Sequence, residues 1–238
     1  MDSRTTARAH PVNLQKGIIS IVSLDPYVIP GTTVLRNKLD ITNQLELDRA
    51  ERLLVVQRTL EGPPKGRFDL AHLKSIHRHL FQDVYDWAGE LRTVEISKEG
   101  HSFQFIRFID TGMADVHRRL VTSSFLKGLS EQDFSEQAAK IIGDVNYVHP
   151  FREGNGRTQL EYLRQLASAS GHHFDPDLLD PNTWQSASRL SHDGNYGAIA
   201  KAILEQGMVS TKESQERMEK QRAQHRAAWE ARNKGRGF

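Results

Sequence analysis

Cysteine is missing from all 238 residues of this sequence. Its absence excludes disulfide bonds, thiolate metal ligands and thiol nucleophiles. Long apolar runs are missing too: none approaches the ~20 residues that a membrane-spanning helix needs. The stretch from Met1 to Lys16 lacks the apolar core of a signal peptide. Apolar residues make up 37% of the chain and charged residues 26%, which is typical of a globular domain. We therefore expect a soluble protein of the cytoplasm.

An excess of one sign of charge is also lacking, because the net charge is only +2. The charge is unevenly placed: residues 212–238 carry a net charge of +4, which leaves −2 for the rest of the chain. A basic tail can bind nucleic acid or an acidic partner. Here acidic residues are interleaved with the basic ones, and basic and aromatic residues do not alternate. The pattern therefore favours a solvated surface helix and no direct contact with nucleic acid.

Apolar residues recur at three- and four-residue spacing along much of the chain, which predicts helices. Gly62-Pro63-Pro64 separates the first two of them, and Asp133 is placed to cap a later one. We therefore predict an all-α fold. The predicted buried faces are Leu45, Leu47, Ala50, Leu53, Leu54 and Leu60; Phe68, Leu73, Ile76 and Leu80; Val116 and Leu120; and Phe134, Ala138, Ile141, Ile142, Val145 and Val148.

One stretch, residues 91–105, does not follow the helical spacing. Its β-branched and aromatic residues stand on both sides of Lys98-Glu99-Gly100, which predicts a short β-hairpin. Two short strands alone are marginal in water, so this hairpin must pack on helices or receive a third strand.

The segment from His149 to Thr158 joins two predicted helices and carries the chemistry. Pro150 disfavours helical geometry at His149, so the helix before it should end there, and a new helical pattern follows Gly156. Gly154-Asn155-Gly156 permits backbone angles that place successive N–H groups at a helix N-terminus, where anions such as phosphate bind.

Three side chains of the same segment add charge or a titratable group. Arg157 offers a bidentate fork for phosphate, and Glu153 is a candidate Mg²⁺ ligand beside phosphates. His149 is a candidate base for an incoming hydroxyl group. A base, a metal ligand and a phosphate cradle in one loop predict phosphoryl or nucleotidyl transfer.

This segment, from His149 to Arg157, resembles the motif of the Fic family, His-x-Phe-x-Asp/Glu-Gly-Asn-Gly-Arg-x-x-Arg. The resemblance runs from about residue 20 to residue 205. It divides the chain into an N-terminal extension (1–20), a Fic domain (21–209) and a charged, basic, helical C-terminal tail (210–238). Two further segments resemble the N-terminal part of FicT-type toxins and of related secreted effectors: Tyr27-Val28-Ile29-Pro30-Gly31 and Leu35-Arg36-Asn37-Lys38. Two others resemble the family's segment before its hairpin and its closing segment: Trp87-Ala88-Gly89-Glu90-Leu91-Arg92-Thr93 and His192-Asp193-Gly194-Asn195-Tyr196.

The resemblance implies an all-α helical bundle, with the motif between two central helices and a small β-hairpin, called the flap, over the active site. In the family, a segment of the target protein docks beside the flap as an added strand, through backbone hydrogen bonds that tolerate varied sequences. The family's activity is protein adenylylation, the transfer of AMP from ATP to a Ser, Thr or Tyr hydroxyl of a target protein. The residues that would dock the target here are Thr93, Val94, Glu95, Ile96 and Ser97.

The resemblance also implies a role for each residue of the motif. His149 is the general base that deprotonates the target hydroxyl, and Phe151 is a buried anchor for the loop. Glu153 holds Mg²⁺ between the α- and β-phosphates of ATP, and Arg157 contacts the β-phosphate. The hydroxyl attacks the α-phosphorus, and pyrophosphate leaves. The residues that form the anion hole are Gly154, Asn155 and Gly156.

One position departs from the family motif. The second motif arginine, which binds the γ-phosphate in the family, is replaced here by Leu160. Loss of a charge-assisted phosphate contact is worth about 1.5–3 kcal/mol, or roughly ten- to a hundredfold in affinity. Arg164 lies one turn further along the same face, and helical side chains lean toward the N-terminus, so Arg164 is predicted to compensate in part.

Fic proteins are often inhibited by a helix that carries Ser/Thr-x-x-x-Glu-Gly/Asn. Thr42 and Glu46 have the first spacing, but Leu47 follows them, so the chain contains no such motif. The resemblance therefore implies a separate small antitoxin that supplies the inhibitory glutamate. Because that glutamate pairs with the second motif arginine, Leu160 also predicts altered control.

Several alternatives remain at this stage. Other Fic proteins transfer UMP or phosphocholine, and Doc-type proteins, which carry Lys in place of Gly156, phosphorylate their targets. The replacement at Leu160 leaves open a weakened or degenerate domain that acts as a nucleotide- or partner-binding module. FicT-type toxins modify DNA gyrase and topoisomerase IV, whereas the family's secreted effectors modify host GTPases. No translocation domain is seen after the Fic region, so bacterial targets are the expected ones.

Overall fold

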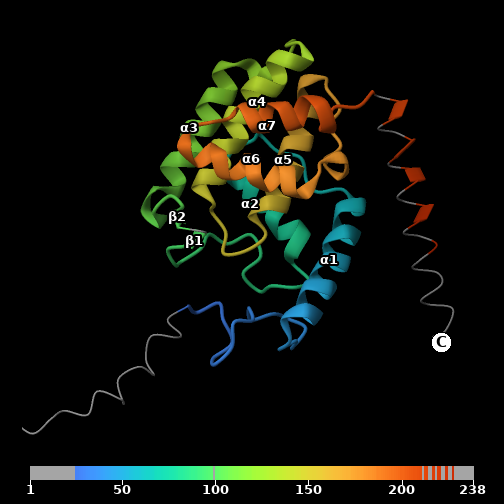
Figure 1. Cartoon of the computed structure of the whole chain (residues 1–238). Helices are drawn as coiled ribbons and strands as arrows, with labels where there is room; N and C mark the ends of the chain where they lie inside the picture. Colours follow the sequence, from blue (N-terminus) through green and yellow to red (C-terminus); the bar gives the residue numbers. More distant parts are fainter. Residues whose placement is uncertain are drawn as a thin grey trace, which may run out of the picture.

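The computed structural model describes residues 25–98, residues 100–210 and some of the residues between 212 and 227. The predicted extension over residues 1–20 lies outside the described residues, as does part of the predicted tail. The described part is a helical bundle with one small hairpin (Figure 1). Its helices are α1 (Gln44–Glu61), α2 (Leu70–Phe81), α3 (Ile109–Thr122), α4 (Glu131–Val148), α5 (Asn155–Ser170), α6 (Pro181–Leu190) and α7 (Gly197–Ala202). Short helical turns are η1 (Ile106–Phe108), η2 (Ser124–Leu126), η3 (Pro176–Leu178), η4 (Ser191–Asp193) and η5 (Ile203–Gly207).

The helices α4 and α5 form the centre of the bundle. Helix α4 packs on α3, α5 and α7, while α2 covers α5. The predicted apolar face of α4 is confirmed, because its six residues from Phe134 to Val148 are all buried. The predicted cap is wrong: Ser130 caps α4 by accepting from the backbone N–H of Asp133 at 3.1 Å. The helix thus starts before Asp133, whose carboxylate accepts from the Ser130 hydroxyl.

The two helices nearer the N-terminus differ in how well the sequence predicts them. The predicted apolar face of α2 is confirmed, since Leu73, Ile76 and Leu80 are all buried. Helix α1 also forms where predicted, but its predicted face is wrong in part, because Leu45 and Leu53 are exposed. Apolar residues occur on several sides of α1, and the helix packs mainly on α2, so only a narrow side of it is buried.

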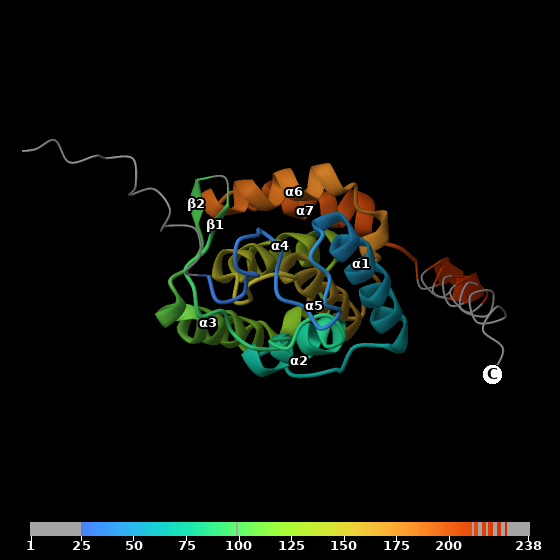
Figure 2. The same cartoon turned by 90° about the horizontal axis from the view of Figure 1, so that it is seen from below.

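The predicted hairpin is confirmed, with short strands. Strand β1 (Ser97–Lys98) pairs antiparallel with β2 (His101–Ser102), with Ser97 opposite Ser102. Figure 2 shows the hairpin at one edge of the bundle and α1 at the opposite edge. The backbone N–H of Gln104 donates to the carbonyl of Tyr147 at 3.0 Å, which fastens the hairpin to α4. The hairpin therefore packs on helices, as a two-stranded unit requires.

The C-terminal tail is described only in part. Its described residues between 212 and 227 are helical and exposed. No helix of the part of the chain that the structure describes is long and apolar enough to cross a membrane.

Candidate functional site

The loop between α4 and α5 has a backbone shape that its residues dictate. Helix α4 ends at Val148, and the next residue, His149, takes a left-handed conformation with φ of +45° and is followed by Pro150. Gly154 is also left-handed, with φ of +81°, and a Cβ there would lie 2.4 Å from the Phe81 ring. Only glycine meets both requirements, so Gly154 is fixed by the fold itself.

A side-chain clamp closes this loop. The amide of Asn155 accepts from the backbone N–H of Phe151 at 3.0 Å and donates to the Phe151 carbonyl at 2.7 Å. The Phe151 ring is fully buried and stacks on His77 with ring centroids 3.9 Å apart. The side chain of Asn155 is therefore used inside the loop, and its backbone N–H is what it can offer to a phosphate.

The first turn of α5 has the features of an anion site. Its leading N–H groups lack acceptors within the helix, and the backbone N–H of Thr158 is bonded to the Gly154 carbonyl at 3.1 Å. A Cβ at Gly156 would meet no atom within 4 Å. Glycine at this position is thus not required by packing, and the open space lets a phosphate approach the backbone closely.

The side chain of His149 is held as a neutral imidazole. Its Nδ1 lies 3.0 Å from the carbonyl of Asn146, so Nδ1 carries the proton and Nε2 keeps a lone pair. Burial lowers the pKa of His149 to about 3, and the charge of Arg92 also lowers it. The ring stacks on Phe103 with centroids 3.7 Å apart. A neutral histidine with a free Nε2 has the form that a general base needs.

Glu153 stands at the edge of the anion site. Its Oε1 accepts from the backbone N–H of Gly154 at 2.8 Å, and the carboxylate is about half exposed. No group of three or more potential metal ligands occurs among the residues that the structure describes. A single carboxylate beside a phosphate site fits Mg²⁺, which takes its remaining ligands from phosphates and water.

A pocket of about 560 Å³ opens over this loop. The N-terminus of α5 and the ring of His149 line it on one side. The hairpin contributes Lys98 and His101, and the segment from α6 to η4 contributes Trp184 and His192. The predicted base, metal ligand and anion hole thus meet in one cavity with the hairpin at its rim.

Arg92 connects the hairpin to the catalytic loop. Its side chain is 1% exposed. The Nε atom donates to the carbonyl of His149 at 2.9 Å, and the backbone N–H donates to the carbonyl of Pro150 at 2.9 Å. The terminal nitrogens donate to the carbonyl of Val94 at 3.0 Å and to the carbonyl of Gln104. One buried guanidinium therefore joins the loop to both legs of the hairpin.

The predicted docking residues approach β1 with alternating exposure. Thr93, Glu95 and Ser97 are exposed, whereas Val94 and Ile96 are half-buried. Only Ser97 lies within a strand. The hydroxyl of Tyr27 accepts from the backbone N–H of Thr93 at 3.1 Å, so the N-terminal segment supports the start of the hairpin.

Arg157 reaches the pocket, but its guanidinium is engaged by protein groups. Nη1 lies 2.6 Å from a carboxylate oxygen of Glu51 on α1, and Nη2 lies 3.5 Å from Glu153. The guanidinium carbon stands 4.7 Å from the centroid of the Phe81 ring.

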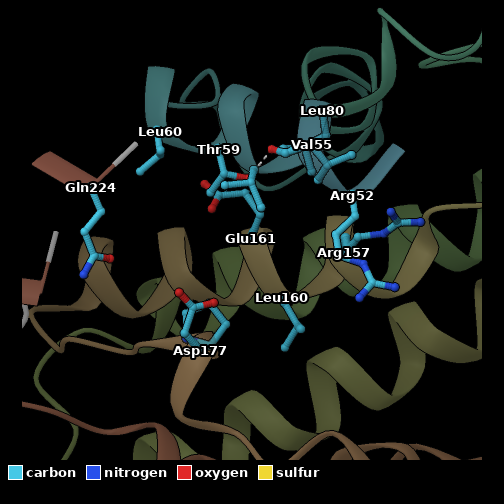
Figure 3. Close-up of a pocket in the computed structure, with 12 residues that line it drawn as sticks. Arg52, Val55, Thr59, Leu60, Leu80, Arg157, Leu160, Glu161, Asp177 and Gln224 are labelled. Atoms are coloured by element: carbon cyan, nitrogen blue, oxygen red, sulfur yellow. Dashed lines mark hydrogen bonds between the residues drawn. The ribbon is translucent and has the colours of Figure 1, made fainter. Parts of the chain in front are cut away.

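The structure does not bring Arg164 to the pocket. Its guanidinium forms two hydrogen bonds of 2.7 Å with Glu161, so it is turned to a neighbour on its own helix. Leu160 is half-buried and lines both the pocket and a groove of about 490 Å³ between α1 and α5. Figure 3 shows this groove, with Arg52 and Arg157 at one end and Gln224 toward the other.

Several residues that shape the site were not predicted from the sequence. Glu51 and His77 reach the loop from α1 and α2. The Nε2 atom of His77 lies 3.0 Å from the carbonyl of Glu153, and its Nδ1 atom accepts a hydrogen bond from the backbone N–H of Gly89. Burial lowers the pKa of His77 to about 4. Arg92 was noted only as part of a resembling segment. Long-range contacts of this kind leave no spacing pattern along the chain, so no signal in the sequence could have found them.

The sequence matches known proteins over the same region. The Fic/DOC family model matches residues 67–167. The protein adenylyltransferase VbhT of Bartonella schoenbuchensis is 40% identical over 76% of this chain, and the chain spans only 38% of that protein's length. The probable protein adenylyltransferase y4lH of Sinorhizobium fredii is 37% identical, with 75% of this chain and 94% of that protein covered. The probable protein adenylyltransferase Fic of Escherichia coli is 33% identical, with 77% and 94% covered.

Solved structures share the fold. The VirB-translocated effector BepC of Bartonella tribocorum, solved with bound AMPPNP, has a TM-score of 0.70 at 27% identity, over 78% of this chain and 97% of that one. A Fic domain from Bartonella quintana with bound ADP has a TM-score of 0.71 at 26% identity, over 78% and 96%. From the motif loop, the hairpin above it and these matches, we conclude that the chain belongs to the Fic/DOC family.

Proposed function

We propose that this protein is an enzyme, a protein adenylyltransferase that moves AMP from ATP to a Ser, Thr or Tyr hydroxyl of a target protein. The observation that carries the proposal is the placement of a neutral His149, with Nε2 unprotonated, beside the open N-terminus of α5. The names of the bacterial relatives and the nucleotides bound in similar structures support it.

In the proposed reaction, the backbone of Gly156 and its neighbours binds the α-phosphate region, and Arg157 contacts the β-phosphate. Glu153 would hold Mg²⁺, which would neutralise phosphate charge. The Nε2 atom of His149 takes the proton of the target hydroxyl. The oxygen then attacks the α-phosphorus, the bond to the β-phosphate bridging oxygen breaks, and pyrophosphate leaves.

The test uses ATP labelled at the α- or the γ-phosphate. The purified protein is incubated with Mg²⁺ and bacterial lysate, beside a His149→Ala variant. We expect α-label on a discrete protein, and none with the variant. Label from the γ-position alone would mean phosphorylation and would overturn the proposal.

The proposed targets are bacterial type II topoisomerases, DNA gyrase and topoisomerase IV, which places the enzyme in the bacterial cytoplasm. Residues 27–38 resemble the N-terminal part of FicT-type toxins and of related secreted effectors, and the likeness to FicT toxins supports this choice. Purified subunits of both enzymes, incubated with the protein and α-labelled ATP, should become labelled. Labelling of other lysate proteins with neither topoisomerase modified would contradict it.

A small antitoxin is the proposed inhibitor, and we propose that its glutamate-bearing helix docks in the groove between α1 and α5, which Figure 3 shows. The groove is lined by apolar side chains such as Val56 and Leu60, which suit one face of an amphipathic helix. Arg52 and Arg157 offer positive charge at one end. A helical peptide with Ser-x-x-x-Glu-Gly should inhibit the transfer, and Val56→Lys should abolish the inhibition without lowering the uninhibited rate. Equal inhibition of both proteins would exclude this groove.

Leu160 favours a second possibility, a domain that binds nucleotide or a partner with little or no transfer. ATP binding without any label transfer, restored by Leu160→Arg, would support that alternative.

A further inference from the structure

Helix α1 contributes a buried carboxylate to the site. Glu51 is 8% exposed and lies outside residues 67–167, the part of the chain that the family model matches. Its carboxylate accepts a hydrogen bond from the hydroxyl of Tyr85 and pairs with Nη1 of Arg157 at 2.6 Å. A residue from a separate helix thus binds a residue of the motif.

The contacts of Arg157 fix the plane and direction of its guanidinium. Glu51 binds one terminal nitrogen, and the Phe81 ring lies 4.7 Å from the guanidinium carbon. The other terminal nitrogen is directed toward Glu153, at the edge of the pocket. A guanidinium has five N–H donors, so a bond to Glu51 leaves donors for a phosphate on the Glu153 side.

The pair should persist when a nucleotide binds. If Arg157 left Glu51 for a phosphate, Glu51 would stay buried with only the Tyr85 hydroxyl as partner. Leaving a buried charge without its counter-ion is more unfavourable than one phosphate contact is favourable. Arg157 therefore gains most by keeping Glu51 on one edge while its other edge meets the phosphate.

We infer that Glu51 is a positioning residue, which orients Arg157 of the motif toward the β-phosphate of the bound nucleotide. This inference rests on the proposed function, in which Arg157 contacts the β-phosphate. Glu51 itself touches no substrate, and Tyr85 orients Glu51 in turn.

The test measures the affinity of the full chain for ATP and for AMP, which lacks the β- and γ-phosphates. Both nucleotides are titrated calorimetrically in the presence of Mg²⁺. Glu51→Gln keeps the size of the side chain and removes its charge. We expect its affinity for ATP to fall about tenfold and its affinity for AMP to stay unchanged. Glu46→Gln, at an exposed position in the first turn of the same helix, is the matched control and should bind both ligands like the unaltered protein.

Arg157→Ala distinguishes the contact between Arg157 and the β-phosphate from the positioning role of Glu51. If Arg157→Ala does not lower the preference for ATP over AMP, the proposed β-phosphate contact is wrong, and the role of Glu51 falls with it. If Arg157→Ala lowers the preference while Glu51→Gln leaves it unchanged or increases it, only the positioning role is overturned. The double variant should match Arg157→Ala alone, because Glu51 acts through Arg157.

A thermal melt checks that Glu51→Gln is folded. If it is not, Glu51→Asp takes its place, since it keeps the charge and retracts the carboxylate by one methylene. A weaker ATP preference in Glu51→Asp supports positioning, and an unchanged preference overturns it.

Discussion

Leu160 is the residue at which this chain departs from the Fic motif, and Arg164 does not replace the missing charge. Arg164, the predicted substitute, is bound to Glu161 and lines neither the pocket nor the groove. The half-buried leucine side chain instead joins the apolar groove to the pocket. The replacement therefore removes one phosphate donor and adds apolar surface at the same point.

Leu160→Arg should raise the affinity for ATP relative to ADP by roughly ten- to a hundredfold, because it restores a charge-assisted contact to the γ-phosphate. ADP lacks that phosphate and serves as the internal control. Titration of both nucleotides measures the ratio. An unchanged ratio would mean that position 160 does not face the γ-phosphate in this protein.

Residues of the motif loop differ in how far the sequence predicts them. The phosphate cradle was predictable because Gly154, Asn155 and Gly156 are adjacent and follow a helix stop at Pro150. The separate tasks of the two glycines were not predictable: Gly154 is required by the Phe81 ring, which comes from another helix, whereas Gly156 has open space above it. The clamp made by Asn155 was not predictable either, because it depends on how the folded loop brings Asn155 to the backbone of Phe151.

At the scale of elements, the hairpin and the α4–α5 loop behave as one unit. Arg92 binds the loop at His149 and both legs of the hairpin at Val94 and Gln104. If the target strand docks on the hairpin, the distance from its hydroxyl to His149 is set through this side chain. The unit explains how a hairpin with two-residue strands is held in a fixed position.

Arg92→Lys should lower the rate of AMP transfer by at least about tenfold, because a point charge cannot reach three separate carbonyls as the guanidinium does. The affinity for ATP should stay unchanged, since no contact of Arg92 reaches the anion site. Transfer assays and nucleotide titrations measure the two effects. Glu90→Gln, near the same turn and mostly exposed, is the control. A parallel loss of ATP affinity would show a general structural role instead.

Helix positions were predictable where one face is strongly apolar and less so elsewhere. Helix α4 has a continuous apolar stripe, and its predicted face is confirmed. Helix α1 has apolar residues on several sides, so its pattern could not show that Leu53 is exposed and Glu51 is buried. That buried charge is compensated by Arg157 from α5 and Tyr85, which lie far away in sequence.

For the whole molecule, stability should depend on pH through two histidines, His77 and His149, whose pKa values are lowered in the folded state. Burial lowers the pKa of His149 to about 3 and that of His77 to about 4, below the ordinary value of 6.5. Below pH 6.5 the unfolded chain therefore binds protons that the folded chain does not. The contribution of these histidines to the free energy of unfolding is therefore complete above pH 6.5. It decreases as the pH falls toward the folded-state pKa.

His149→Ala isolates one of these groups. Between pH 7.5 and pH 5, the stability of the unaltered protein should fall by about 2 kcal/mol more than that of the variant, which lacks the titrating ring. Urea unfolding at the two pH values gives the comparison. Equal losses in both proteins would mean that His149 is not kept neutral by burial.

The most direct measurement of the central claim is mass spectrometry of the acceptor peptide. Bacterial lysate is incubated with Mg²⁺, ATP and either the unaltered protein or His149→Ala, and peptides are compared with an untreated sample. The proposed function predicts an AMP group on a Ser, Thr or Tyr side chain, present only with the unaltered protein. A phosphate group at that position, or the same AMP group with His149→Ala, would contradict AMP transfer by this loop.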